Sequence, residues 1–112
     1  MPGAASVPYG NVGLFEVMSL TLTPALIAGN TSAEQTFTLP GVKVGDMIFV
    51  QKPTTQAGLL VESRVVAVKD TVAVVFGNLT GSNITPTAAE LYTFLVVRYE
   101  NYMLQNPPTS LG

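Results

Sequence analysis

The sequence predicts a single all-β domain built as an antiparallel β-sandwich. Apolar side chains recur with a period of two in successive short runs, and these runs are rich in Val, Thr, Phe and Tyr. Such residues suit a pleated, half-buried surface. No run has the length of the helices that connect parallel strands. A chain of 112 residues has room for one domain and one core.

The first half of the chain contains three predicted strands, at 14–22, 33–39 and 47–51. In 14–22 the even-numbered residues face one way and the odd-numbered residues the other. In 33–39 the alternation places Phe37 and Leu39 inward. Pro40-Gly41 ends the second run, and Gly45-Asp46 precedes the third, as is typical of turns. A further strand at 25–28 is weakly indicated.

The second half contains three more predicted strands, at 61–68, 72–76 and 91–99. In the second of them, Val72, Val74 and Phe76 alternate with Ala73 and Val75. In the third, one face carries Tyr92, Phe94, Val96 and Arg98, and the other carries Leu91, Thr93, Leu95, Val97 and Tyr99. The loop before the first of them holds Gly58, which can supply a positive φ. The segment 85–90 has room for one helical turn, with Thr85 as its cap and Pro86 at its first position.

Six or seven strands at this spacing indicate a sandwich or a barrel, and the partly apolar character of both faces favours two packed sheets. We expect an extended arm at 1–13, a sandwich domain at 14–102 and a tail at 103–112. Prolines and glycines interrupt both ends. The ends either fray or lie on neighbouring subunits. For the second case the apolar residues outside the strand pattern are the candidate protein contacts: Val7, Pro8, Tyr9, Val12, Tyr102, Met103 and Leu104. The last three can equally finish the final strand.

Charge is scarce, because 47% of the residues are hydrophobic and only 11% are charged. A typical soluble domain has about 25% charged residues. Low charge favours association, so we expect another protein to cover part of the surface. The net charge is −2 and the five cations are scattered, which argues against nucleic-acid binding. No apolar run suits a membrane span, and the first residues do not resemble a signal peptide.

The residue types that most catalytic sites need are missing, since the chain has no Cys and no His. This removes thiolate nucleophiles and the best acid–base group near neutral pH. No two carboxylates have a spacing that suggests a glycosidase, and the Asn-rich loop at 78–83 has no carboxylate for calcium. We therefore expect no catalytic, cofactor or metal site and no enzyme. A small hydrolase or lyase on the same scaffold is the alternative that this argues against.

A series of segments carries a family resemblance: 44–53, 56–59, 63–65, 70–78 and 84–92. In this order they resemble the decoration (cement) proteins of tailed bacteriophages, over about half of the chain. The resemblance implies a jelly-roll-like β-sandwich that binds the phage major capsid protein as a dimer or trimer. It also implies a place on the outside of the capsid in the virion, after synthesis in the bacterial cytoplasm, and a role in stabilising the shell.

The alternative hypothesis is that the chain is a receptor-binding or carbohydrate-binding module of a phage fibre or tail. Such a module needs aromatic side chains exposed on one face. The tyrosines are its candidates: Tyr9, Tyr92, Tyr99 and Tyr102.

Overall fold

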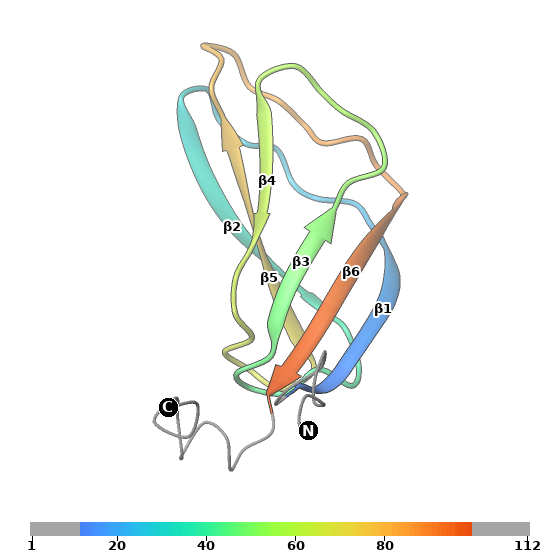
Figure 1. Cartoon of the computed structure of the whole chain (residues 1–112). Helices are drawn as coiled ribbons and strands as arrows, with labels where there is room; N and C mark the ends of the chain where they lie inside the picture. Colours follow the sequence, from blue (N-terminus) through green and yellow to red (C-terminus); the bar gives the residue numbers. More distant parts are fainter. Residues whose placement is uncertain (1–11, 100–112) are drawn as a thin grey trace, which may run out of the picture.

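Two antiparallel sheets of three strands pack face to face in the computed structural model, which describes residues 12–99 (Figure 1). This confirms the predicted all-β sandwich, and the described residues include no helix. The jelly-roll-like detail stays a prediction. The strands are β1 (Val12–Leu22), β2 (Thr31–Thr38), β3 (Met47–Gln51), β4 (Leu59–Ser63), β5 (Thr71–Asn78) and β6 (Glu90–Tyr99).

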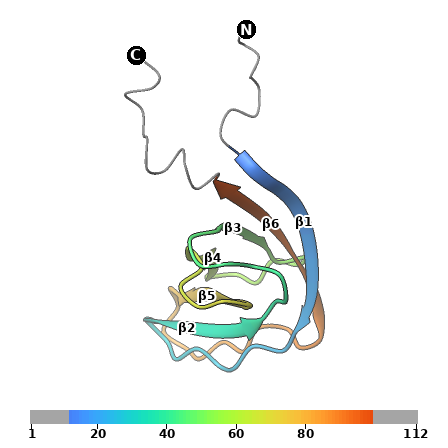
Figure 2. The ribbon, with the colours of Figure 1, turned by 90° about the horizontal axis from the view of Figure 1, so that it is seen from below.

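The strand order is β1-β6-β3 in one sheet and β2-β5-β4 in the other. β6 and β5 are therefore the central strands, each with a neighbour on both sides. Only the connection from β4 to β5 stays within a sheet, while the other four cross from one sheet to the other. Figure 2 shows the two layers edge-on, with β1, β6 and β3 in one and β2, β5 and β4 in the other.

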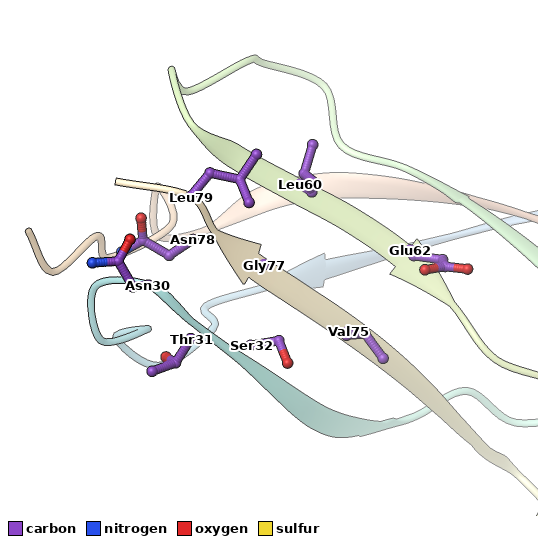
Figure 3. Close-up of a pocket in the computed structure, with 9 residues that line it drawn as sticks. All are labelled: Asn30, Thr31, Ser32, Leu60, Glu62, Val75, Gly77, Asn78 and Leu79. Carbon is purple, nitrogen blue, oxygen red and sulfur yellow. The ribbon is translucent and has the colours of Figure 1, made fainter. Parts of the chain in front are cut away.

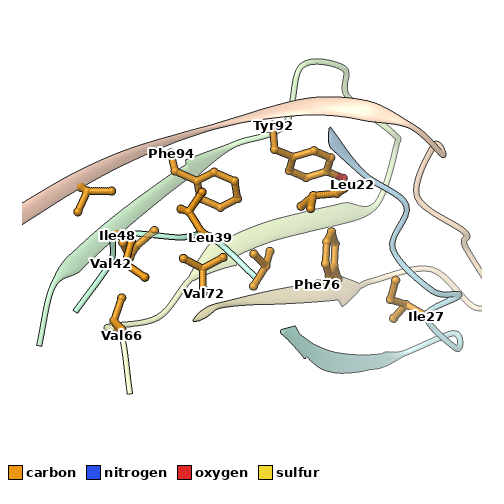
Figure 4. Close-up of a cluster of buried hydrophobic side chains, with 12 residues drawn as sticks. Leu22, Ile27, Leu39, Val42, Ile48, Val66, Val72, Phe76, Tyr92 and Phe94 are labelled. Carbon is orange, nitrogen blue, oxygen red and sulfur yellow. The ribbon is translucent and has the colours of Figure 1, made fainter. Parts of the chain in front are cut away.

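The core lies between the sheets and is formed mainly by the two central strands (Figure 4). Alternate residues of each central strand point inward, and three hydrophobic residues in each strand are fully buried. These inward residues are Val72, Val74 and Phe76 of β5, and Tyr92, Phe94 and Val96 of β6.

β1 begins at Val12, two residues before the predicted start and inside the predicted arm at 1–13. Val12 pairs with Tyr99, and the register shifts between Val12 and Leu14. The ladder with β6 therefore extends the strand past Gly13.

The strand predicted at 61–68 is wrong in its second half, because β4 ends at Ser63. The Arg64 amide still donates to the Ala73 carbonyl of β5 (3.1 Å), and the chain then leaves the sheet and pairs with the turn before β3. The Val66 amide donates to the Asp46 carbonyl (2.9 Å), and the Gly45 amide donates to the Val66 carbonyl (2.8 Å). Val66 is buried there, while Val65 and Val68 are exposed.

The segment 85–90 forms no helical turn. It is extended up to a turn at Ala88 and Ala89, where Ala89 has a φ of +56°. The weak strand at 25–28 is reduced to one isolated bridge between Ile27 and Ile84. Gly58 has a φ of +81°, as predicted for its loop.

Candidate protein interface

The outer face of the β1-β6-β3 sheet carries no charged side chain at any of its described positions. Because alternate residues of a strand face opposite sides, the residues out of phase with the buried core of β6 form this face. We call it the uncharged face. It consists of Val12, Phe15, Val17, Ser19 and Thr21 of β1, Leu91, Thr93, Leu95, Val97 and Tyr99 of β6, and Met47, Phe49 and Gln51 of β3.

Strand register arranges six apolar side chains of this face in two rows across the three strands. One row is Phe15–Val97–Met47, and the next is Val17–Leu95–Phe49. We call these six residues the apolar stripe. Three of its side chains are more than half exposed: Phe15 at 64%, Val17 at 66% and Phe49 at 52%. Contiguous exposed apolar groups of this kind mark interaction surfaces.

The stripe continues into a polar row, Ser19–Thr93–Gln51. An open hollow of about 470 Å³ lies where the two meet, lined among others by Val17, Phe49 and Thr93. Uncharged hydrogen-bonding groups therefore border the apolar side chains, as at the rim of a protein interface.

The outer face of the β2-β5-β4 sheet is different, because it carries Glu34 and Glu62 among its outward residues. Its hollow of about 630 Å³ is lined by Asn30, Glu62 and Leu60 among others (Figure 3). Apolar and charged groups alternate there and form no continuous stripe. Of the two outer faces, the uncharged face is the better candidate for contact with another protein.

A buried ion pair fixes the end of the sheet that carries the stripe. Arg98, near the end of β6, donates from Nε to Asp46 Oδ1 and from Nη2 to Oδ2, both at 2.9 Å. It also donates to the Gly41 carbonyl (3.0 Å), so it holds the loop between β2 and β3. Burial alone would raise the pKa of Asp46, but hydrogen bonds from Arg98 and from the Lys43 amide outweigh burial and lower this pKa.

Sequence reasoning missed this pair because it interpreted Gly45-Asp46 only as a turn signal. A signal was present, since Arg98 occupies the same alternate positions as the buried Tyr92, Phe94 and Val96. A cation at an inward position requires a partner that neutralises it. The position of the partner depends on tertiary structure and cannot be read from spacing.

A second ion pair joins Lys52, just after β3, to Glu90 at the start of β6, with Nζ and Oε1 2.8 Å apart. Hydrogen bonds from Lys52 and Thr54 lower the pKa of Glu90. Both ion pairs are structural clamps between neighbouring segments. Within residues 12–99 no three His, Cys, Asp or Glu side chains come close enough together to hold a metal ion. The same residues form no helix long and apolar enough to cross a membrane.

Of the predicted contact residues only Val12 is described, and it is half-buried at the start of β1. The other six, Val7, Pro8, Tyr9, Tyr102, Met103 and Leu104, lie outside the described residues. Among the tyrosines, Tyr92 is fully buried and cannot present a ring to a ligand; burial and the nearby Glu90 raise its pKa to about 12. Tyr99 is 36% exposed on the uncharged face, and its hydroxyl donates to Met47 Sδ (3.0 Å).

The apolar stripe itself was not predicted. The alternation placed Phe15 and Val17 on one face of the first strand and Leu95 and Val97 on one face of the last. Only the pairing of β1, β6 and β3 brings these faces together. Comparison of the chain with protein-family models, with curated proteins and with solved structures found no match.

Proposed function

We propose that this chain is a structural protein that binds another protein through its uncharged face, as a decoration protein on the outside of a phage capsid. The observation that carries the proposal is the stripe of six apolar side chains on a sheet face without charge. Burial of such groups is favourable and leaves no charge to desolvate.

A rigid sheet is suited to this role. The stripe lies on three paired strands whose opposite side is anchored by buried residues, so little conformational freedom is lost when the face is covered. A protein that binds the assembled shell better than its separate subunits stabilises the shell by mass action. Many copies, each with a modest interface, add up to a large effect.

The resemblance to capsid decoration proteins supports the choice of partner, namely the major capsid protein. The segments that carry it include β3 with Met47 and Phe49 of the stripe, whereas the stripe residues of β1 and β6 lie outside these segments. The low proportion of charged residues, 11%, also fits a chain that works while partly covered.

The experiment is co-sedimentation with empty capsids of the same virus, using two matched variants. Phe49→Asp places a charge in the stripe, and Leu60→Asp makes the same kind of change on the other outer face, where Leu60 is 57% exposed. We expect Phe49→Asp to weaken capsid binding at least about tenfold, which corresponds to roughly 1.4 kcal/mol. Leu60→Asp should bind like the unmodified protein. Equal binding by both variants would contradict the role of the face, and no sedimentation of the unmodified protein would contradict the capsid as partner.

A carbohydrate-binding module is the second candidate, because Phe15, Phe49 and Tyr99 lie on the same uncharged face. Aromatic rings with hydroxyl and amide groups beside them suit sugar recognition. Binding to a glycan array that is lost in Phe49→Leu would favour this function. Docking on a protein should tolerate Phe49→Leu, because the apolar character of the side chain is kept.

A further inference from the structure

The outer edge of β1 is the longest open sheet edge of the described residues, and its one irregularity is the register shift between Val12 and Leu14. β1 is an edge strand of eleven residues with no Pro, Lys or Arg, and its only charged residue is Glu16. Outside its ladder with β6, no backbone–backbone hydrogen bond of the described chain involves residues 12–22. Native proteins normally shield such a row of free N–H and C=O groups.

The other edge strands are shorter. β3 and β4 lie against each other at the ends of their sheets, and the Ser63 hydroxyl donates to the Ile48 carbonyl. The outer backbone edge of β2, which has eight residues, is open as well, but a side chain of this strand is tied to the preceding loop. The Ala25 amide donates to Gln35 Oε1 (2.8 Å), and Gln35 Nε2 donates to the Ala25 carbonyl (3.1 Å). β1 is therefore the longer of the two open edges, and it is the one that borders the apolar stripe.

We propose that β1 pairs antiparallel with β1 of a second copy of this chain, so that the two β1-β6-β3 sheets join into one sheet of six strands. A second copy is the partner that the edge itself specifies. A strand paired with its own copy about a two-fold axis meets an edge of equal length and identical chemistry. Antiparallel pairing then satisfies the free backbone groups of both copies.

The composition of β1 favours one register. Full overlap of Val12–Leu22 with its copy places Val17 opposite Val17 at the two-fold axis. Like charges directly opposite each other on paired strands are destabilising. In this register Glu16 lies opposite Met18 of the second copy, so the two Glu16 side chains are not directly opposed.

This register also joins the two apolar stripes. The row Val17–Leu95–Phe49 of one copy runs straight into the same row of the other, because both rows end at the axis. The uncharged face is doubled without the addition of a charge. The inference rests on the edge of β1 and does not depend on the identity of the partner proposed above.

The test uses the absence of cysteine from the chain, which makes an introduced thiol unique. Val17→Cys places the thiols of two copies directly opposite each other. The Cα atoms would then be about 4.5–5.5 Å apart, within the range that a disulfide spans. Gln51→Cys is the matched control, because Gln51 is exposed on the same face but on the β3 edge.

We expect most of the Val17→Cys protein to form a disulfide-linked dimer under mild oxidation, while Gln51→Cys stays uncrosslinked. Phe15→Cys should crosslink poorly, since its two copies would be separated by about four residues along the strand, roughly 13 Å. Analytical ultracentrifugation of the unmodified protein should give a species of twice the 11.8 kDa chain mass.

A mass that stays monomeric or trimeric would overturn the inference, and this measurement needs no variant. The inference would also be overturned if Val17→Cys formed crosslinks no more efficiently than Gln51→Cys. The two proposals fail separately. Phe49→Asp should weaken capsid binding while leaving the dimer mass unchanged, and loss of the dimer in solution would not by itself affect co-sedimentation.

Discussion

At the scale of single residues, a buried carboxylate keeps its charge only where donors replace the water that it has lost. Asp46 is 1% exposed and accepts three such bonds at 2.9 Å, one from the Lys43 amide and two from Arg98. One of these bonds closes the turn before β3, and the others tie that turn to β6. The carboxylate therefore connects segments that are 52 positions apart in the chain.

Asp46→Asn should lower the free energy of unfolding by about 2–3 kcal/mol. A broken buried ion pair typically costs about 3–5 kcal/mol. The loss expected here is at the lower end of that range or below it, because the Arg98 side chain is 27% exposed and water screens its charge. Urea denaturation measures the loss. The matched control is Glu62→Gln, the same chemical change at an exposed position of β4, which should stay within about 0.5 kcal/mol.

The loss of unfolding free energy caused by Asp46→Asn should also depend on pH. Because the pKa of Asp46 in the folded protein lies below its ordinary value of 3.8, its contribution is fully present above that value and disappears as pH falls through the folded pKa. The difference in stability between the unmodified protein and Asp46→Asn should therefore be constant near neutral pH and shrink below pH 3.8. Glu90 also has a lowered pKa, but it is present in both proteins and cancels in the difference. A difference that stays constant in acid would contradict the assignment.

At the scale of elements, the loop before β4 depends on a glycine. Gly58 has a φ of +81°, and a Cβ at this position would collide with Thr80 Cγ2. Its carbonyl accepts a bond from the Leu79 amide (2.9 Å), so the loop is fixed against the end of β5. A side chain at position 58 would therefore cause both backbone strain and a clash with Thr80, and a second substitution at Thr80 can separate the two effects.

Gly58→Ala should cost about 2–3 kcal/mol in unfolding free energy, from strain of about 1–2 kcal/mol plus the clash. Adding Thr80→Ser removes the methyl group and keeps the hydroxyl that donates to Asn78 Oδ1 (2.7 Å). The double variant should therefore regain the part of the loss that is due to the clash. Gly77→Ala is the control, because its added Cβ meets nothing closer than 3.7 Å. No recovery in the double variant would show that strain alone is responsible.

The elements also show what could be predicted from sequence. The alternation in β5 and β6 was sufficient to place Val74 with Phe76, and Phe94 with Tyr92, on one face of each strand, because side-chain direction in a strand is set locally. The structure shows that these are the faces that form the core. The end of β4 could not be predicted, since Val65, Val66 and Val68 continue an apolar run. Only the pairing of Val66 with Asp46, across the fold, takes them out of the sheet. The uncharged face was missed for the same reason, because it depends on which strands become neighbours.

At the scale of the whole molecule, the two central strands hold the sandwich together. Each has a ladder on both sides, and their inward side chains make up the middle of the core. Amide hydrogen exchange should therefore be slowest at the core positions of β5 and β6, where exchange requires global unfolding. Amides of β2 and β4, with a ladder on one side only, should exchange faster. Exchange in β2 as slow as in β5 would contradict this view of the fold.

The place of β6 in the chain has a consequence for synthesis. Within residues 12–99, β1 and β3 find their only sheet partner in β6, the last of the described strands, so neither can enter this sheet until nearly all of these residues have left the ribosome. At about 5–20 residues per second, β1 waits for several seconds after it is complete. During that time its apolar residues and both of its backbone edges are open to other nascent chains. The yield of native protein should thus depend on the spacing of ribosomes on the message.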